Sequence, residues 1–377
     1  MAEVRPEWPG AADEGDLGDW AAAARAVLPL DVWGYLDGGA GAERALRANR
    51  AAYERVALLP RFLVDVSAVS LSTTVLGAEW AVPFGVAPMA YHRLAHPDGE
   101  VATAAAGAGG VFVASMFASR AWSDIAAAGT GPRWLQLYWL RNRDALADVV
   151  ARAEDAGFGA LVLTVDAPRV ASRPRDSRSA FALPDDVRAV NVDPAVMDSA
   201  HTATAGASAI QVHSRQRFDA SVTWADLPWL RERTSLPLLL KGILTAHDAR
   251  LAVEHGVDGV VVSNHGGRQL DAAVPSLDAL PAVVAAVPAG YPVLLDGGVR
   301  RGSDVFAALA LGARAVLVGR PVLWGLAAGG RDGAAAVLQL LREQLEECMV
   351  LAGRPTVAAI DRTAVAVRPG GWSTASG

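Results

Sequence analysis

The 377-residue sequence contains a single cysteine, Cys348. One thiol excludes an intrachain disulfide and every metal site that needs several cysteines. The residues around it have the character of a helix near the C-terminal end, so we expect Cys348 to be a small packed side chain. We expect no metal site in this chain.

Long apolar runs and blocks of like charge are also missing. No apolar run reaches about 18 residues without a charge or a helix breaker, and the N-terminus lacks a basic segment followed by an apolar one. The net charge of −6 is not concentrated in any block, which argues against a nucleic-acid partner. We therefore expect a cytoplasmic protein whose partners include neither nucleic acid nor membrane.

Lysine is nearly absent, because Lys241 is the only one among 34 basic residues. A compact ammonium and a planar guanidinium are not interchangeable in a tight site. Lys241 is therefore a candidate functional residue in a chain that otherwise uses arginine.

The chain is rich in apolar residues, at 52%, arranged in short runs that alternate with alanine-rich helical segments. The runs lack the in–out alternation of half-exposed strands, as expected when both faces of a sheet are covered. Strand–helix alternation fits a doubly wound sheet or a closed barrel. The count of eight favours a (β/α)8 TIM barrel with strands at Phe84–Ala90, Val111–Ser115, Trp134–Trp139, Ala160–Asp166, Leu236–Ile243, Gly259–His265, Pro292–Gly298 and Ala315–Pro321.

We expect one domain over residues 1–377, of which 1–15 are disordered. Helical patterns at 17–28 and 42–58 precede the barrel. Far more chain separates the fourth and fifth runs than any other pair, which predicts an insertion at 174–227 after the fourth strand, acting as a lid.

Polar residues gather where the apolar runs end. In a barrel these carboxyl ends meet at one mouth, where active sites lie. The residues concerned are Gln136, Tyr138, Thr164, Asp166, Lys241, Asn264, His265, Asp296 and Arg320.

The sixth run ends in Ser263-Asn-His-Gly-Gly-Arg-Gln269. His265 could act as a general base, and Arg268 could hold a carboxylate with two parallel hydrogen bonds. Asp166 ends the fourth run, and pairing with His265 would raise the pKa of the imidazole. The alternative is that the histidine and the aspartate are ordinary hydrogen-bonded residues at strand ends.

The last two runs end in Asp296-Gly-Gly-Val-Arg300 and Val318-Gly-Arg320. Barrels often bind a phosphate at these loops through glycine N–H groups. The alternative is that the glycines serve only the turns. Lys241 ends the fifth run and could form a Schiff base or hold negative charge on a cofactor.

The sequence resembles the FMN-dependent 2-hydroxy-acid oxidase and dehydrogenase family, which includes glycolate oxidase, lactate oxidase and mandelate dehydrogenase. Ser263–Gln269 is similar to the family's active-site signature, and the resemblance runs from about Ala22 to about Leu351. The segments 87–100 and 318–324 look closest to 4-hydroxymandelate oxidases.

The resemblance implies a role for each matching position. His265 would be the catalytic base with Asp166 as its partner, and Lys241 would lie near the flavin ring. The substrate carboxylate would be held by Arg268, Arg173 and Tyr35, with Tyr138 beside the substrate hydroxyl. The remaining FMN contacts would come from Pro88, Met89, Ala90, Ser115, Gln136, Thr164, Asp296, Gly298, Arg300, Gly319 and Arg320.

Three positions depart from the family pattern. Many relatives have two consecutive arginines where this chain has Ser172-Arg173. Glycolate oxidases place a tryptophan over the substrate where this chain has Phe117, which favours an aromatic substrate such as mandelate or 4-hydroxymandelate. Hydroxymandelate oxidases carry phenylalanine where this chain has Tyr35.

The resemblance therefore implies oxidation of an (S)-2-hydroxy acid to the 2-oxo acid, with O2 reduced to hydrogen peroxide, by a homo-oligomer that we expect to be a tetramer. Ala90 favours an oxidase over a dehydrogenase that uses another acceptor. Two different functions would also fit a barrel of this kind. One is an isomerase or lyase that binds FMN or phosphate, and the second is a barrel that has lost catalysis and only binds a ligand.

Overall fold

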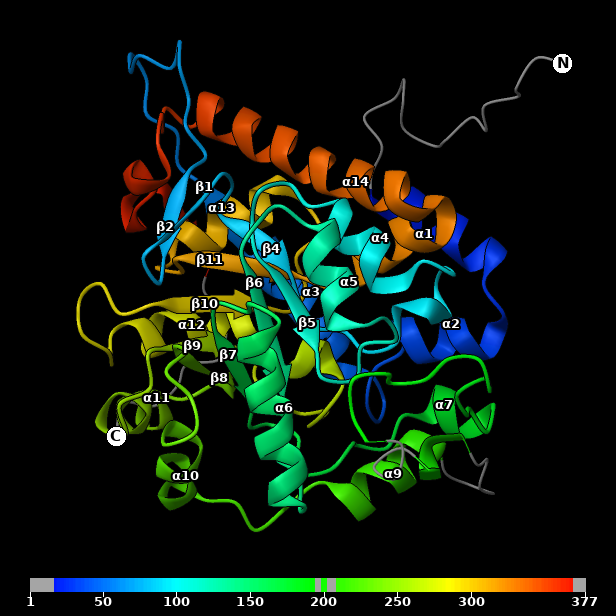
Figure 1. Ribbon diagram of the computed structural model, residues 1–377. Helices are drawn as coiled ribbons and strands as arrows, with labels where there is room; N and C mark the ends of the chain where they lie inside the picture. Colours follow the sequence, from blue (N-terminus) through cyan, green and yellow to red (C-terminus); the bar gives the residue numbers. More distant parts are fainter. Residues whose placement is uncertain (1–16, 194–197, 202–207, 369–377) are drawn as a thin grey trace, which may run out of the picture.

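The computed structural model describes residues 17–193, 198–201 and 208–368, so the predicted disorder of 1–15 lies outside the described residues. Eight parallel strands close into a barrel in the order β10-β11-β4-β5-β6-β7-β8-β9 (Figure 1). All eight predicted runs are strands of this barrel, which confirms the predicted fold. The strands are β4 (Phe84–Val86), β5 (Phe112–Ser115), β6 (Arg133–Leu137), β7 (Leu161–Thr164), β8 (Leu238–Ile243), β9 (Gly259–Val262), β10 (Val293–Asp296) and β11 (Ala315–Val318).

Apolar side chains fill the barrel interior and also cover the outer face of its strands. Val113, Val162, Leu239, Val261 and Leu317 belong to one cluster, and each is at most 1% exposed. The larger cluster joins the outer face of the strands to the surrounding helices. Continuous apolar runs are needed because neither face of the wall meets water.

Helices cover the outside of the barrel, each following a strand (Figure 1). The long α14 ends the series and carries Cys348, which is half-buried as predicted. The bounds are α4 (Gly99–Ala105), α5 (Trp122–Ala128), α6 (Arg143–Asp155), α11 (Ala246–Glu254), α12 (Ser276–Val284), α13 (Gly302–Ala310) and α14 (Arg320–Leu351). Within the described part of the chain, no helix combines the length and apolar character needed to cross a membrane.

A hairpin closes the end of the barrel opposite the strand carboxyl ends. It consists of β2 (Thr73–Val75) and β3 (Ala78–Trp80). Trp80 is fully buried, and its ring lies 5.4 Å from that of Trp134 on β6. The hairpin therefore covers the barrel interior at the end opposite the polar side chains.

The N-terminal segment differs from expectation in two places. Helices α1 (Leu17–Val27) and α3 (Arg44–Glu54) follow the predicted patterns, but a third helix, α2 (Leu30–Asp37), lies between them and buries Tyr35. The predicted helix at 42–58 ends early because β1 (Val56–Leu58) pairs antiparallel with β12 (Val365–Val367). That partner lies at the other end of the chain, beyond any local pattern.

The segment between β7 and β8 contains short helices and lies beside α2 in Figure 1. Its contact with α2 includes the ring of Phe181, which stacks on Tyr35 with centroids 4.4 Å apart. Its role as a lid stays a prediction. Its elements are α7 (Pro174–Arg178), η2 (Asp198–His201), α9 (Ala209–Arg217), η3 (Trp224–Asp226) and α10 (Leu227–Arg231).

Candidate active site

One cavity lies at the carboxyl ends of the barrel strands, and the predicted site residues converge on it. Two residues predicted at the strand ends do not line it: Asp166 lies behind His265, and Asn264 bonds to Asn49 on α3 instead. The functional roles of these residues stay predictions. The lining includes Tyr35, Pro88, Met89, Ala90, Ser115, Phe117, Gln136, Tyr138, Thr164, Arg173, Lys241, His265, Arg268, Asp296, Gly298, Arg300, Gly319 and Arg320.

The candidate base is held in a tight turn after β9. His265 itself has a φ of 59°, in the left-handed region, and Gly266 and Gly267 follow at 61° and 76°. A side chain at position 267 would meet the backbone nitrogen of Leu46 at 2.5 Å, so α3 can pack here only against glycine. The turn leaves 18% of the His265 side chain exposed.

The imidazole and the carboxylate are paired, because Nδ1 of His265 lies 2.9 Å from Oδ1 of Asp166. Burial lowers the pKa of His265 below its ordinary value, and the opposing effect of Asp166 does not reverse this. Asp166 thus raises the pKa of His265 as predicted, but the net pKa is lowered because burial has the larger effect. Burial would raise the pKa of Asp166, but His265 and then Lys241 bring it below its usual range. The resting pair is thus a neutral imidazole with a carboxylate.

A glycine on β8 makes room for the carboxylate. Gly242 has a φ of 114°, and a side chain there would lie 2.6 Å from Cβ of Asp166. A larger residue at position 242 would fit only if β8 or the loop that carries Asp166 moved.

Lys241 is buried and has two polar partners among the described residues. Its ammonium lies 3.0 Å from Oδ2 of Asp296 and donates to the hydroxyl of Ser263 at 3.0 Å. Burial would lower the pKa of this group, but Asp296 and Asp166 together raise it above its ordinary value. A Schiff base requires the neutral amine, so the geometry favours the alternative in which Lys241 holds negative charge.

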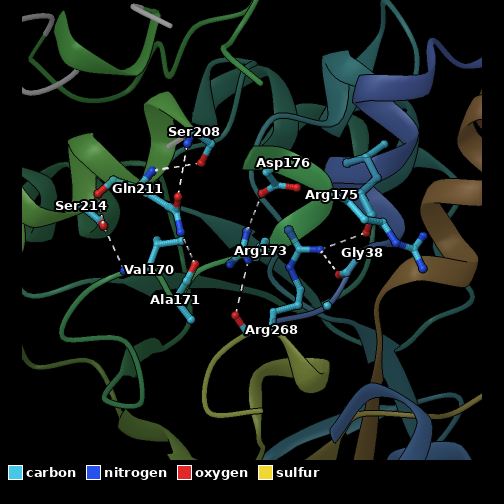
Figure 2. Close-up of polar contacts among 12 residues, drawn as sticks. Gly38, Val170, Ala171, Arg173, Arg175, Asp176, Ser208, Gln211, Ser214 and Arg268 are labelled. Carbon is cyan, nitrogen blue, oxygen red and sulfur yellow. Dashed lines mark hydrogen bonds and ion pairs between the residues drawn. The ribbon is translucent and has the colours of Figure 1, made fainter. Parts of the chain in front are cut away.

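Two arginines that line the cavity, the buried Arg173 and the half-buried Arg268, lie close together (Figure 2). Arg173, 4% exposed, donates through Nε to the carbonyl of Arg268 at 3.4 Å, and its Nη1 lies 3.9 Å from Asp176. Arg268 donates to the carbonyl of Gly38 at 2.8 Å, and its guanidinium lies 5.4 Å from the ring centre of Tyr35. Burial, then the charge of Arg268, lowers the pKa of Arg173 to about 10. An anion between these groups would relieve their repulsion.

A second cationic region lies at the loops after β10 and β11. Arg320 donates to the carbonyls of Gly38 and Gly266 at 2.9 and 3.0 Å. Burial, followed by the charges of Arg268 and Arg300, lowers the pKa of Arg320 to about 9. Gly298 lines the cavity with a φ of 86°, and a side chain there would meet the backbone oxygen of Asn49 on α3 at 2.7 Å. This excess of positive charge beside a glycine turn fits one phosphate group.

The polar side chains of three adjacent strands form a chain across the mouth. Ser115 donates to Oε1 of Gln136 at 3.0 Å, and Nε2 of Gln136 donates to Thr164 at 3.0 Å. A buried Oδ1 of Asp296 accepts no hydrogen bond from the described residues. Together with the phosphate site, these donors and acceptors suit a polar ring system attached to a phosphate, as in FMN.

Aromatic rings form another wall of the cavity. The sequence alone indicates only some of these rings. Phe117, Tyr138 and Phe218 stack nearly parallel, with centroids 4.6 to 6.1 Å apart. His213 meets the edges of Phe117 and Phe218, and burial followed by the charge of Arg217 lowers its pKa to about 4. Phe218 and His213 come from the insertion together with Ile210, and no local spacing signals their place in the cavity.

Comparison with known proteins places these features in context. The family model described as FMN-dependent dehydrogenase matches residues 24–367. The chain is 49% identical over 348 residues to the 4-hydroxymandelate oxidase of Amycolatopsis orientalis, covering 92% of this chain and 96% of the relative. It is 45% identical over 353 residues to the L-lactate oxidase of a Nostoc strain, with 92% and 96% covered. A crystal structure of mandelate oxidase with (S)-4-hydroxymandelic acid matches with a TM-score of 0.90 at 47% identity, covering 95% of this chain and 99% of that one.

Proposed function

The chain belongs to the FMN-dependent dehydrogenase family, and from this membership we propose that it oxidises an (S)-2-hydroxy acid to the 2-oxo acid, with O2 reduced to hydrogen peroxide. The observation that carries the proposal is the His265–Asp166 pair, whose histidine lines one cavity together with Arg173 and Arg268. A base and a carboxylate site are what this substrate class requires.

Each group has a task in this reaction. Arg173 and Arg268 bind the substrate carboxylate, which removes the repulsion between them. His265 accepts a proton from the substrate, and Asp166 stabilises the imidazolium that results. The Tyr138 hydroxyl keeps its proton, because burial raises its pKa, and it can donate to the substrate oxygen. Tyr35, under Arg268, holds the same carboxylate from the α2 side.

The cofactor is FMN. When bound it would supply a two-electron acceptor: the substrate loses two electrons and two hydrogens, one of them as the proton that His265 accepts, and O2 gains both electrons and both hydrogens to give hydrogen peroxide. Arg300, Arg320 and the glycines beside them would hold its phosphate. Lys241 would face the ring system with a charge that can balance negative charge there. The proposal of O2 as acceptor is supported by Ala90 in the cavity and by relatives that are themselves oxidases.

We propose an aromatic substrate, mandelate or 4-hydroxymandelate. The stacked wall of Phe117 and Phe218, edged by a neutral His213, offers a flat apolar surface to a phenyl ring. The relative from Amycolatopsis and the matching crystal structure concern the same substrates. This choice also agrees with phenylalanine at position 117.

The test is anaerobic mixing of the purified yellow protein with (S)-mandelate, followed by absorbance. We expect rapid bleaching, recovery of colour and hydrogen peroxide when O2 is admitted, and a kcat/KM for mandelate above that for lactate or glycolate. Extraction should release FMN. Equal or better turnover of lactate would reject the aromatic substrate, and FAD at unit stoichiometry would reject the cofactor.

We also propose a cytoplasmic homotetramer. The apolar side chains of Phe62 and Leu63 are 80% and 106% exposed, which supports contact with further copies of the chain. Light scattering on a sizing column and cell fractionation test the two parts of this proposal.

A further inference from the structure

Gln269, the residue after Arg268, has a buried side chain, 7% exposed, with an unusual set of partners. Its Nε2 donates to the carbonyl oxygens of Asp166 and Arg169, both at 3.0 Å. Its Oε1 accepts from the backbone nitrogen of Ala171, also at 3.0 Å. One amide thus bonds three times to the loop after β7.

That loop, residues 165–173, carries Asp166 and Arg173 and has no regular secondary structure. Its backbone polar groups must find partners outside a helix or sheet. Helix α9 supplies two of them, because Gln211 donates to the carbonyl of Ala171 at 2.8 Å and Ser214 accepts from the backbone nitrogen of Val170 at 2.9 Å (Figure 2). Gln269 supplies three more from the loop after β9.

Gln269 joins the loop after β7 to the loop after β9. Each loop supplies one residue of the base–carboxylate pair and one of the two substrate arginines. Asp166 meets His265 at 2.9 Å, and Arg173 meets the carbonyl of Arg268 at 3.4 Å. Asp166 and Arg173 belong to the loop that Gln269 binds. His265 and Arg268 precede Gln269 in the chain by four residues and one residue. A shift of one loop against the other would therefore disturb the base and the carboxylate site together.

We propose that Gln269 is a positioning residue, which sets the base against its carboxylate partner and one substrate arginine against the other by clamping the loop after β7. This inference rests on the proposed function. Only a primary amide on this stem can donate to two carbonyls and accept from an N–H at once. Glutamate lacks the donors, methionine lacks donors and an oxygen acceptor, and asparagine is shorter by one methylene.

The experiment compares Gln269→Met and Gln269→Glu with the wild-type holoenzyme. Calorimetry measures the dissociation constant of (S)-2-phenylpropionate, an aromatic carboxylate without the hydroxyl that is oxidised. Anaerobic stopped flow measures flavin reduction by (S)-mandelate, and FMN content and melting temperature are recorded for each protein.

For Gln269→Met we expect a weaker dissociation constant and slower reduction, each by roughly 10- to 100-fold, because small misplacements of reacting groups have effects of this size. FMN content should not change, since the groups proposed to hold the phosphate lie on other loops. Gln269→Glu should lose more, because its carboxylate would face two carbonyl oxygens. Gln339→Met removes an exposed amide on α14 and should behave as wild type.

A purely structural role would lower the melting temperature and leave the folded protein's two constants within about twofold of wild type, which would overturn the inference. If Gln269→Met fails to fold, Gln269→Asn serves the same comparison. Failure of the wild type to bleach with any 2-hydroxy acid would overturn the proposed function instead. If the wild type reduces its flavin with (S)-mandelate and Gln269→Met does so at the same rate, only the proposed role of Gln269 is overturned.

Discussion

The imidazole of His265 and the carboxylate of Asp166 lie 2.9 Å apart although 99 residues separate them in the chain. Burial lowers the pKa of the imidazole and Asp166 opposes that effect. The pKa of His265 is therefore set by two opposing contributions, and removal of the Asp166 charge should shift it further down.

The pH dependence of kcat/KM should reveal this balance. Only neutral His265 can accept a proton, and its pKa is lowered, so activity should fall as pH drops through a value below 6.5. Asp166→Asn removes the negative charge that favours the protonated form, so the acid limb should move to still lower pH, with a smaller maximum rate. Profiles from pH 4 to 9 check this, and an upward shift in Asp166→Asn would contradict it.

His265→Gln should abolish flavin reduction while retaining substrate affinity. The lost proton acceptor should raise the barrier by several kcal/mol, at about 1.4 kcal/mol for each tenfold loss in rate. Stopped-flow reduction by mandelate and titration with benzoylformate separate the two effects. Reduction within a few-fold of wild type would show that another group is the base.

Arg268→Met should instead weaken binding, because the carboxylate loses a bidentate partner and stays partly desolvated. Arg268→Lys should recover only part of the affinity, since an ammonium cannot present two parallel donors. Arg173→Met should also weaken binding, and the double variant should lose less than the two losses combined. The dissociation constants of benzoylformate check these expectations, and full additivity would argue that the two arginines bind different groups.

Lys241 and Asp296 should depend on each other for stability. The two side chains are 5% and 8% exposed, so Lys241→Met leaves a buried carboxylate without its cation, at a cost of roughly 3–5 kcal/mol. Lys241→Met/Asp296→Asn removes both charges and should regain part of the lost melting temperature. A double variant that melts below Lys241→Met would rule out this coupling.

Phe117→Trp tests the size of the aromatic wall. The larger indole would occupy space that a substrate ring needs, since Phe117 is 4% exposed and packed against Phe218. We expect kcat/KM for mandelate to fall relative to lactate by about 10- to 100-fold, as for other steric changes in apolar pockets. An unchanged ratio in steady-state assays would place the substrate ring elsewhere.

The sequence predicted the barrel because each strand is a contiguous apolar run, and the site because the residues at strand ends must meet. Pairing of Asp166 with His265 could be inferred in this way. The wall residues Phe218 and His213, and the clamp by Gln269, could not, since each depends on how a loop without regular structure folds back over the mouth. Helix α2 was missed because its eight residues are too few to show a clear period.

The pairing of β1 with β12 has a consequence for synthesis in the cell. Val56 leaves the ribosome early, yet its partner Val367 is translated roughly 300 residues later, or about 15–60 s at ordinary elongation rates. Throughout that interval β1 lacks its partner, and the barrel itself cannot close, because β4 pairs with the late strand β11. A nascent chain therefore exposes apolar strand edges until β11 and β12 have been made, and messages that stall before the codons for these strands should yield protein for chaperones and proteases.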